Sequence, residues 1–144
     1  MDVAEDAPRG SFELRVRHHG LAEIVERCAG GLRAAHNYAE SLSNLKRYEE
    51  AKVLLRKVMP AARRILGEGH KLTLMMRWYY AAALFNADGA TLDDLREAVD
   101  ALGDAERIAR RVLGGANPLT PSIGRELQKA RATLRARETP SASA

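Results

Sequence analysis

The sequence holds few residues whose types and spacing could support catalysis. His36 lies four residues before Glu40, and Glu68 lies two residues before His70, so each histidine has a carboxylate with which it could exchange a proton. Neither pair has a nucleophile or a third group to orient the histidine. Cys28 falls on the apolar stripe of a predicted helix, where a thiol is buried and inert. We therefore expect no enzymatic activity.

The sequence also holds few residues that could bind a metal or a cofactor. His18 and His19 are adjacent, so on a helix their rings point about 100° apart, and no third ligand is in view. The sequence has no glycine-rich phosphate loop and no cluster of cysteine and histidine ligands. No metal and no cofactor are expected.

One dense group of aromatic and thioether side chains has two interpretations. As a binding surface, it would be an adaptable apolar pocket for a partner side chain. As a structural element, it would be the core between the second hairpin and the C-terminal helix. In the binding interpretation, Trp78 and Phe85 are the best candidates, because their stripe points away from Ala81. The group consists of Met75, Met76, Trp78, Tyr79, Tyr80 and Phe85.

The C-terminal half is rich in basic residues, which could contact nucleic acid if they formed a continuous cationic surface. Acidic residues lie among them at the spacing of helical ion pairs, which favours a solvated, ion-paired face over an RNA site. The basic residues are Arg107, Arg110, Arg111, Arg125, Lys129, Arg131, Arg135 and Arg137, and the acidic ones are Glu97, Glu106, Glu126 and Glu138.

Composition favours a small helical domain. Of 144 residues, 46% are hydrophobic, 29% are charged and only 5% are aromatic, a balance that suits helices. No run of about 18 apolar residues is present, so no membrane span is expected. The acidic N-terminus lacks the apolar core of a secretory signal, and we expect a cytoplasmic protein. A net charge of +4 would assist contact with an acidic partner.

An internal repeat organises the chain. Residues 38–44 align with residues 80–86 at an offset of 42, with four identities. Residues 63–67 align with residues 110–114, and residues 72–73 with 119–120, at an offset of 47. The difference of five residues predicts an insertion between the two helices of the second copy, at residues 87–91.

Hydrophobic periodicity then divides the chain. We expect a mobile tail over residues 1–19 and a helical domain over 20–137, followed by a disordered tail over 138–144. Within the domain, a partial capping helix covers 20–29 and is stopped by Gly30 and Gly31. Repeat 1 covers 31–67, repeat 2 covers 73–114, and a capping helix covers 121–137. Ala39 and Ala51 let the helices of the first hairpin approach closely. Thr73, Thr91 and Thr120 are predicted to cap helix N-termini, Gly67 to end a helix, and Pro60 to bend one.

At these positions the sequence resembles the tetratricopeptide repeat, in which two antiparallel helices of defined small and bulky positions recur. The residues that carry the likeness are Ala39, Leu42, Tyr48, Ala51 and Leu55. The longer unit is similar to the kinesin-light-chain type, whose exit loop runs approximately Leu-Gly-x-x-His-Pro-x-Thr. Residues 66–73 keep its histidine and lose its proline, and residues 113–120 do the reverse. The resemblance covers residues 31–137.

The resemblance implies an all-α, right-handed superhelical stack of antiparallel helix hairpins with a C-terminal capping helix. It also implies a concave groove, lined by the first helix of each unit, that takes peptides. Asn37 matches the position that most often bonds the peptide backbone, but Tyr79 replaces it in the second unit. The groove candidates are Arg33, His36, Asn37, Glu40, Ser43 and Asn44 in the first unit, and Met75, Trp78, Tyr79, Ala82, Phe85 and Asn86 in the second.

The sequence thus predicts a non-enzymatic adaptor that binds a protein or peptide partner through this groove. The first alternative is a structural fragment, a cap or self-associating element of a larger assembly. The second is binding of RNA or an acidic surface by the C-terminal arginines.

Overall fold

The computed structural model of the protein describes residues 29–139. These residues form five α-helices: α3 (Ala29–Asn44), α4 (Tyr48–Ile65), α5 (Lys71–Asn86), α6 (Leu92–Val112) and α7 (Leu119–Glu138). No residue of this range lies in a strand, so the predicted all-α class is confirmed. The predictions for the tail over 1–19, for the helix over 20–29 up to residue 28, and for residues 140–144 lie outside the described residues.

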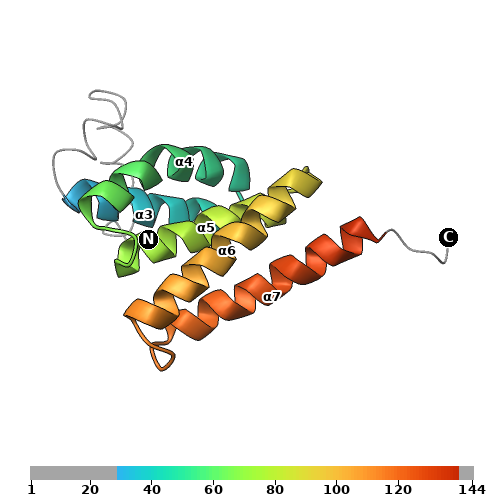
Figure 1. Ribbon diagram of the computed structural model, residues 1–144. Helices are drawn as coiled ribbons and strands as arrows, with labels where there is room; N and C mark the ends of the chain where they lie inside the picture. The colour runs from blue at the N-terminus through green and yellow to red at the C-terminus, as the bar shows by residue number, and fades with distance from the viewer. Residues whose placement is uncertain (1–28, 140–144) are drawn as a thin grey trace.

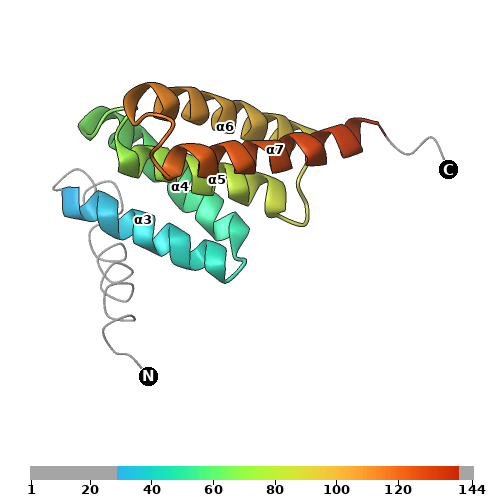
Figure 2. The same ribbon diagram turned by 90° about the horizontal axis from the view of Figure 1, so that it is seen from below.

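The helices form a stack of antiparallel hairpins, as predicted. Each helix packs on the next along the chain, and α5 packs in addition on both α3 and α7. Figures 1 and 2 show α3 and α7 on opposite sides of the stack, with α5 between them. The helices α4 and α6 both pack on α5 but not on each other. The first helices α3, α5 and α7 therefore form one layer, and α4 and α6 form a second.

Alanines occupy the places where these helices pack together. Ala39 and Ala51 in the first hairpin, and Ala81 and Ala98 in the second, are completely buried. A methyl side chain keeps two helix axes close, and the larger leucines fill the space on either side of it. The largest fully buried side chains are Leu32, Leu42, Leu55, Leu74, Met76, Leu84, Leu95, Leu102, Ile123 and Leu127. The core is therefore continuous through both hairpins and α7.

The same turn ends both hairpins. Gly67 follows α4 with φ +96° and Gly114 follows α6 with φ +86°, in the left-handed region that favours glycine. The Gly67 N–H donates to the Ala62 carbonyl at 3.3 Å, and the Gly114 N–H to the Ala109 carbonyl at 3.1 Å. The sequence repeat is thus reproduced as a repeated backbone geometry, and the predicted end of a helix at Gly67 is confirmed.

The caps that follow these turns correct two predictions. The next helices begin at Lys71 and Leu119, so Thr73 and Thr120 lie inside them and are not N-caps. His70 Nδ1 accepts the Leu72 N–H at 3.1 Å, and Asn117 Oδ1 accepts the Leu119 N–H at 3.0 Å. The threonine hydroxyls instead donate backwards, from Thr73 to the Ala62 carbonyl at 3.5 Å and from Thr120 to the Gly114 carbonyl at 2.8 Å. Each threonine therefore links the first turn of its helix to the preceding helix or turn.

Other helix ends were predicted with mixed success. Thr91 caps α6 as expected, and Asp94 completes a capping box with it. Gly30 and Gly31 do not stop a helix, because they lie in the first turn of α3. The second copy is five residues longer than the first. Its connection, residues 87–91, is two residues longer than the connection at residues 45–47, and the greater length of α6 over α4 accounts for the remaining residues. The helix α4 continues through Pro60.

A larger side chain at a packed alanine should destabilise the stack. Ala81→Leu adds volume at a position with no exposed surface, and overpacking of this kind costs about 1–3 kcal/mol of unfolding free energy. Ala136→Leu, at an exposed position of α7, is the matched control. Urea denaturation of both variants measures the difference, and equal stabilities would contradict the placement of Ala81.

The left-handed turn can be tested separately from packing. A Cβ at Gly67 would meet nothing within 4 Å, so Gly67→Ala isolates the backbone cost, about 1–2 kcal/mol. A Cβ at Gly115 would also meet nothing, and its φ is not in the left-handed region. Gly115→Ala should therefore leave the denaturation midpoint nearly unchanged. A loss of stability as large as that of Gly67→Ala would show that the conformation is not responsible.

Candidate functional site

The predicted groove residues lie on α3 and α5, two helices of the first layer that pack on each other. Four of them are exposed, namely Arg33, Asn37, Asn44 and Asn86. Glu40, Ser43, Met75, Trp78, Tyr79, Ala82 and Phe85 are half-buried. His36 is buried, with only 4% of its surface exposed. A freely accessible histidine in the groove is therefore the wrong expectation.

An aromatic cluster joins the two helices and accounts for the burial of His36. The His36 ring meets the Tyr79 ring edge-on, with centroids 5.5 Å apart. Trp78 stacks on Tyr79, with ring centroids 5.8 Å apart and an interplanar angle of 19°. Stacked and edge-on contacts of this kind stabilise a cluster beyond the area that it buries. The structure thus brings His36 of the first unit into contact with Tyr79 of the second, and both are predicted groove residues.

The polar atoms of the cluster are only partly satisfied. His36 Nδ1 lies 3.3 Å from Asn37 Oδ1, whereas His36 Nε2 is buried without a hydrogen-bond partner among the described residues. Burial lowers the pKa of His36 below its ordinary value of 6.5, and the hydrogen bond to Asn37 and the charge of Glu40 oppose that shift. Burial, together with the neighbouring Glu40 carboxylate, raises the pKa of Tyr79 to about 12. Both rings are therefore neutral at physiological pH.

The aromatic and thioether group of α5 divides between core and surface. Met76 and Tyr80 are buried in the core. Met75, Trp78, Tyr79 and Phe85 are half-buried and pack against that core with one side. The structural interpretation therefore holds for the first two residues. The other four keep part of their apolar surface exposed.

Sequence reasoning missed a second polar group, on the other side of α5. The Tyr80 hydroxyl donates to Glu97 Oε2 at 2.6 Å and accepts from Arg56 Nη2 at 2.8 Å. Arg77 is buried, and its guanidinium lies 3.2 Å from Glu68 and 3.8 Å from Asp104. A charged residue within the largely apolar segment 72–85 was the signal that could have revealed this group.

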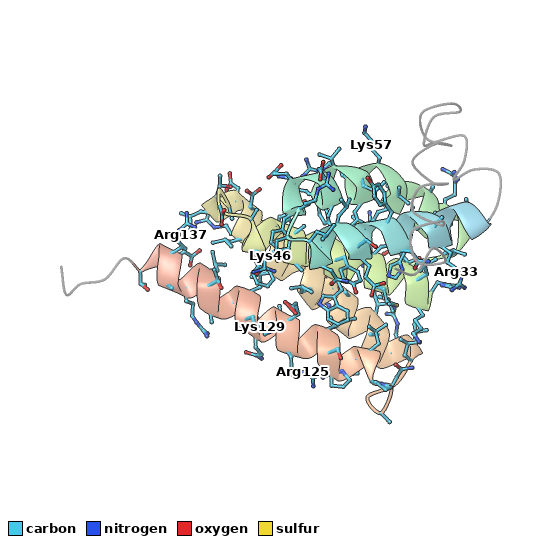
Figure 3. The ribbon with its side chains drawn as sticks, turned by 180° about the vertical axis from the view of Figure 1, so that it is seen from behind. Arg33, Lys46, Lys57, Arg125, Lys129 and Arg137 are labelled. Carbon is cyan, nitrogen blue, oxygen red and sulfur yellow. The ribbon has the colours of Figure 1, made fainter. Side chains whose placement is uncertain are left out.

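Among residues 29–139, basic side chains do not gather into one continuous strip. Figure 3 shows Arg33 at the start of α3, Lys57 on the outer side of α4, and Arg125 and Arg137 towards opposite ends of α7. Arg110 and Lys129 lie within 4.0 Å of Glu106 and Glu126 on their own helices. A phosphate backbone needs cations in a row, so this arrangement does not favour nucleic acid.

The described part of the chain has neither a metal-binding cluster nor a helix that could cross a membrane. Residues 29–139 contain no group of three or more histidine, cysteine, aspartate or glutamate side chains placed to hold a metal ion. None of the described helices has both the length and the apolar character that crossing a bilayer requires. The described surface offers an apolar cluster with polar neighbours.

Comparison with known families agrees with the geometry of the first hairpin. The tetratricopeptide repeat family matches residues 32–70, a range that runs from the first turn of α3 through α4 to His70 at the start of α5. Residues 32–70 are therefore similar to a tetratricopeptide repeat. The hairpin of α5 and α6 lies beyond this match, but it has the same helix order and ends in the same glycine turn. No curated protein and no solved structure matches the chain.

Burial of His36 should make the fold sensitive to mild acid. Because the pKa of His36 is lower in the folded than in the unfolded chain, the unfolded chain binds the proton more readily below about pH 6.5. Stability that is present above that pH is therefore lost as the pH falls. His36→Gln removes this contribution, so the variant should lose less unfolding free energy between about pH 7.5 and about pH 5.5.

Urea denaturation of both proteins at each pH measures the effect. All other histidines and the carboxylates are common to the two proteins, so their titration cancels in the comparison. Parallel losses in the wild type and in the variant would contradict the assignment.

Proposed function

We propose that the protein is a non-enzymatic interaction module that binds a peptide or protein partner on the face of α3 and α5. The observation that carries this proposal is the half-buried surface of Met75, Trp78, Tyr79 and Phe85 on a helix whose other sides are covered. Large aromatic and thioether side chains that keep exposed area are the typical anchors of protein interfaces. Similarity of the first hairpin to an interaction repeat supports the same function.

Polar groups beside this surface suit an extended chain. The Asn37 amide contacts His36, and the Trp78 indole stacks on Tyr79, so each lies next to one of the two rings that meet. A side-chain amide can both donate to and accept from a peptide backbone. Arg33, one turn before Asn37 on α3, adds a cation. The proposed groove residues are therefore Arg33, Asn37, Glu40, Met75, Trp78, Tyr79 and Phe85, while buried His36 supports Tyr79 from below.

Several finer assignments belong to the same proposal. The paired glycine turns after α4 and α6 support a likeness to the kinesin-light-chain type, with Asn117 taking the capping role of the histidine. The equal length of α3 and α5, 16 residues each, supports a second unit over residues 73–114 with α7 as a capping helix. We propose a cytoplasmic adaptor or scaffold. Asn44 and Asn86, at the ends of their helices, are weaker groove candidates because no contact links them to the aromatic cluster.

A peptide array probed with the whole protein tests this function. Peptides that bind should shift the fluorescence of Trp78, the single tryptophan, to shorter wavelength as a partner covers its exposed edge. Trp78→Ala should weaken their binding about tenfold or more, because truncation of an aromatic anchor removes much of an interface's energy. Asn37→Ala should weaken it less. Val53→Ala on α4, which is 48% exposed in the other layer, is the control.

Two outcomes would contradict the proposal. If Val53→Ala weakens binding as much as Trp78→Ala, the partner does not use the α3 and α5 face. If no peptide binds and analytical ultracentrifugation shows a dimer that Trp78→Ala dissociates, the cluster serves self-association, and the structural alternative replaces the adaptor.

A further inference from the structure

A second groove lies on the other side of α5, between α4 and α6. Since α4 and α6 each pack on α5 but not on each other, α5 forms the floor between them (Figure 1). This groove contains a cavity of about 270 Å³. Arg77 and Tyr80 come from the floor, Arg56 and Arg63 from α4, and Glu97 from α6. Three of these five side chains are arginines.

The arginines differ in depth in a way that suits an anion. Arg56 and Arg63 have side chains that are 59% and 41% exposed, so they stand at the rim. The Arg77 side chain is only 8% exposed, and its Nε is buried without a hydrogen-bond partner among the described residues. A buried donor without a partner costs free energy that an acceptor would recover. The cavity thus combines two accessible guanidinium groups with a buried one whose Nε has no partner among the described residues.

Carboxylates near Arg77 leave an excess of positive charge. Glu68 Oε1 lies 3.1 Å from Arg63 Nε, and Glu68 Oε2 lies 3.2 Å from Arg77 Nη1. Asp104 contacts Arg77 at 3.8 Å and also pairs with Arg107. The chain of contacts therefore begins and ends with an arginine and carries one more positive than negative charge. Each guanidinium has five N–H donors, so two shared carboxylates satisfy only part of them.

We propose that this groove binds an oxyanion, the phosphate of a free ion or of a small phosphomonoester, between Arg63 and Arg77. Arg56 adds a cation at the far end, and the apolar side chains of Met59 and Ala101 in the cavity wall receive the carbon part of an ester. Glu68, on the exposed turn after α4, holds the same two guanidiniums when the ligand is absent. It is thus a built-in competitor for the site.

Electrostatics and chemistry support this assignment. The pKa of Arg77 is lowered, first by burial and then by the neighbouring charge of Arg63, and Glu68 and Asp104 compensate only in part. The neighbouring carboxylates therefore neutralise the positive charge of Arg77, at the floor of the groove, only in part. Planar guanidinium groups bind phosphate through paired N–H donors. Glu97, the carboxylate within the cavity wall, is held by the Tyr80 hydroxyl and by Arg56 on the side away from Glu68.

Titration of the whole protein with inorganic phosphate and with O-phosphoserine tests the site. Chloride keeps the ionic strength constant, and isothermal calorimetry together with the Nε–H resonances of the arginines reports binding. Because replacement of buried Arg77 would destabilise the fold, the exposed Arg63 is replaced instead. Arg63→Gln should weaken binding about tenfold, the effect of losing one charge-assisted contact. Glu68→Gln removes the competitor and should tighten binding severalfold.

Lys57→Gln is the matched control, since it removes one charge from the same helix at a side chain that projects away from the groove (Figure 3). Its affinity should equal that of the wild type. Saturable binding of either compound with this order of affinities supports the site, and the two titrations distinguish a free phosphate ligand from an ester. Absence of saturable binding, equal weakening by Lys57→Gln, or weaker binding by Glu68→Gln would overturn the proposal.

Discussion

The stack depends on the packing of α5 on each of the other four described helices. Its sequence is largely apolar, and Arg77 is the charged residue that it buries. An isolated helix of this composition would expose its apolar surface to water, so it is stable only as a shared centre. Hairpins of this kind cannot bury their faces alone, and stacking on a neighbour supplies the missing contact. The core and both candidate sites follow from this one requirement.

The two polar regions of the chain lie on opposite sides of that central helix. Towards α3, Tyr79 covers His36 and leaves an aromatic edge open. Towards α4 and α6, Tyr80 and Arg77 form the floor of a groove crossed by ion pairs. Neighbouring positions on one helix point about 100° apart, so two consecutive tyrosines serve two different surfaces. One side is suited to apolar anchors and the other to charge, so the two proposals place two kinds of ligand on different sides of α5.

The repeat works as a geometric device because its turns are alike even where their residues differ. His70 and Asn117 accept the same backbone N–H in the two turns, and Thr73 and Thr120 both donate back to the preceding helix or turn. An imidazole nitrogen and an amide oxygen are equivalent for this purpose, since each is an acceptor two residues before the donor. Helix α7 therefore starts from its turn much as α5 starts from the turn before it.

The sequence by itself determined the all-α class, the buried alanines, the glycine turn and the cap at Thr91. Each of these depends on residues close together in the chain or on a periodicity that is visible in the sequence. It did not determine that His36 is buried, that His70 rather than Thr73 caps α5, or that Arg77 faces Glu68 and Asp104. Those features depend on which side chain a neighbouring helix places opposite, and on which of two local acceptors is free once the helices have packed. Only the tertiary structure decides such contacts, because packing selects among several partners that the sequence alone leaves equally available.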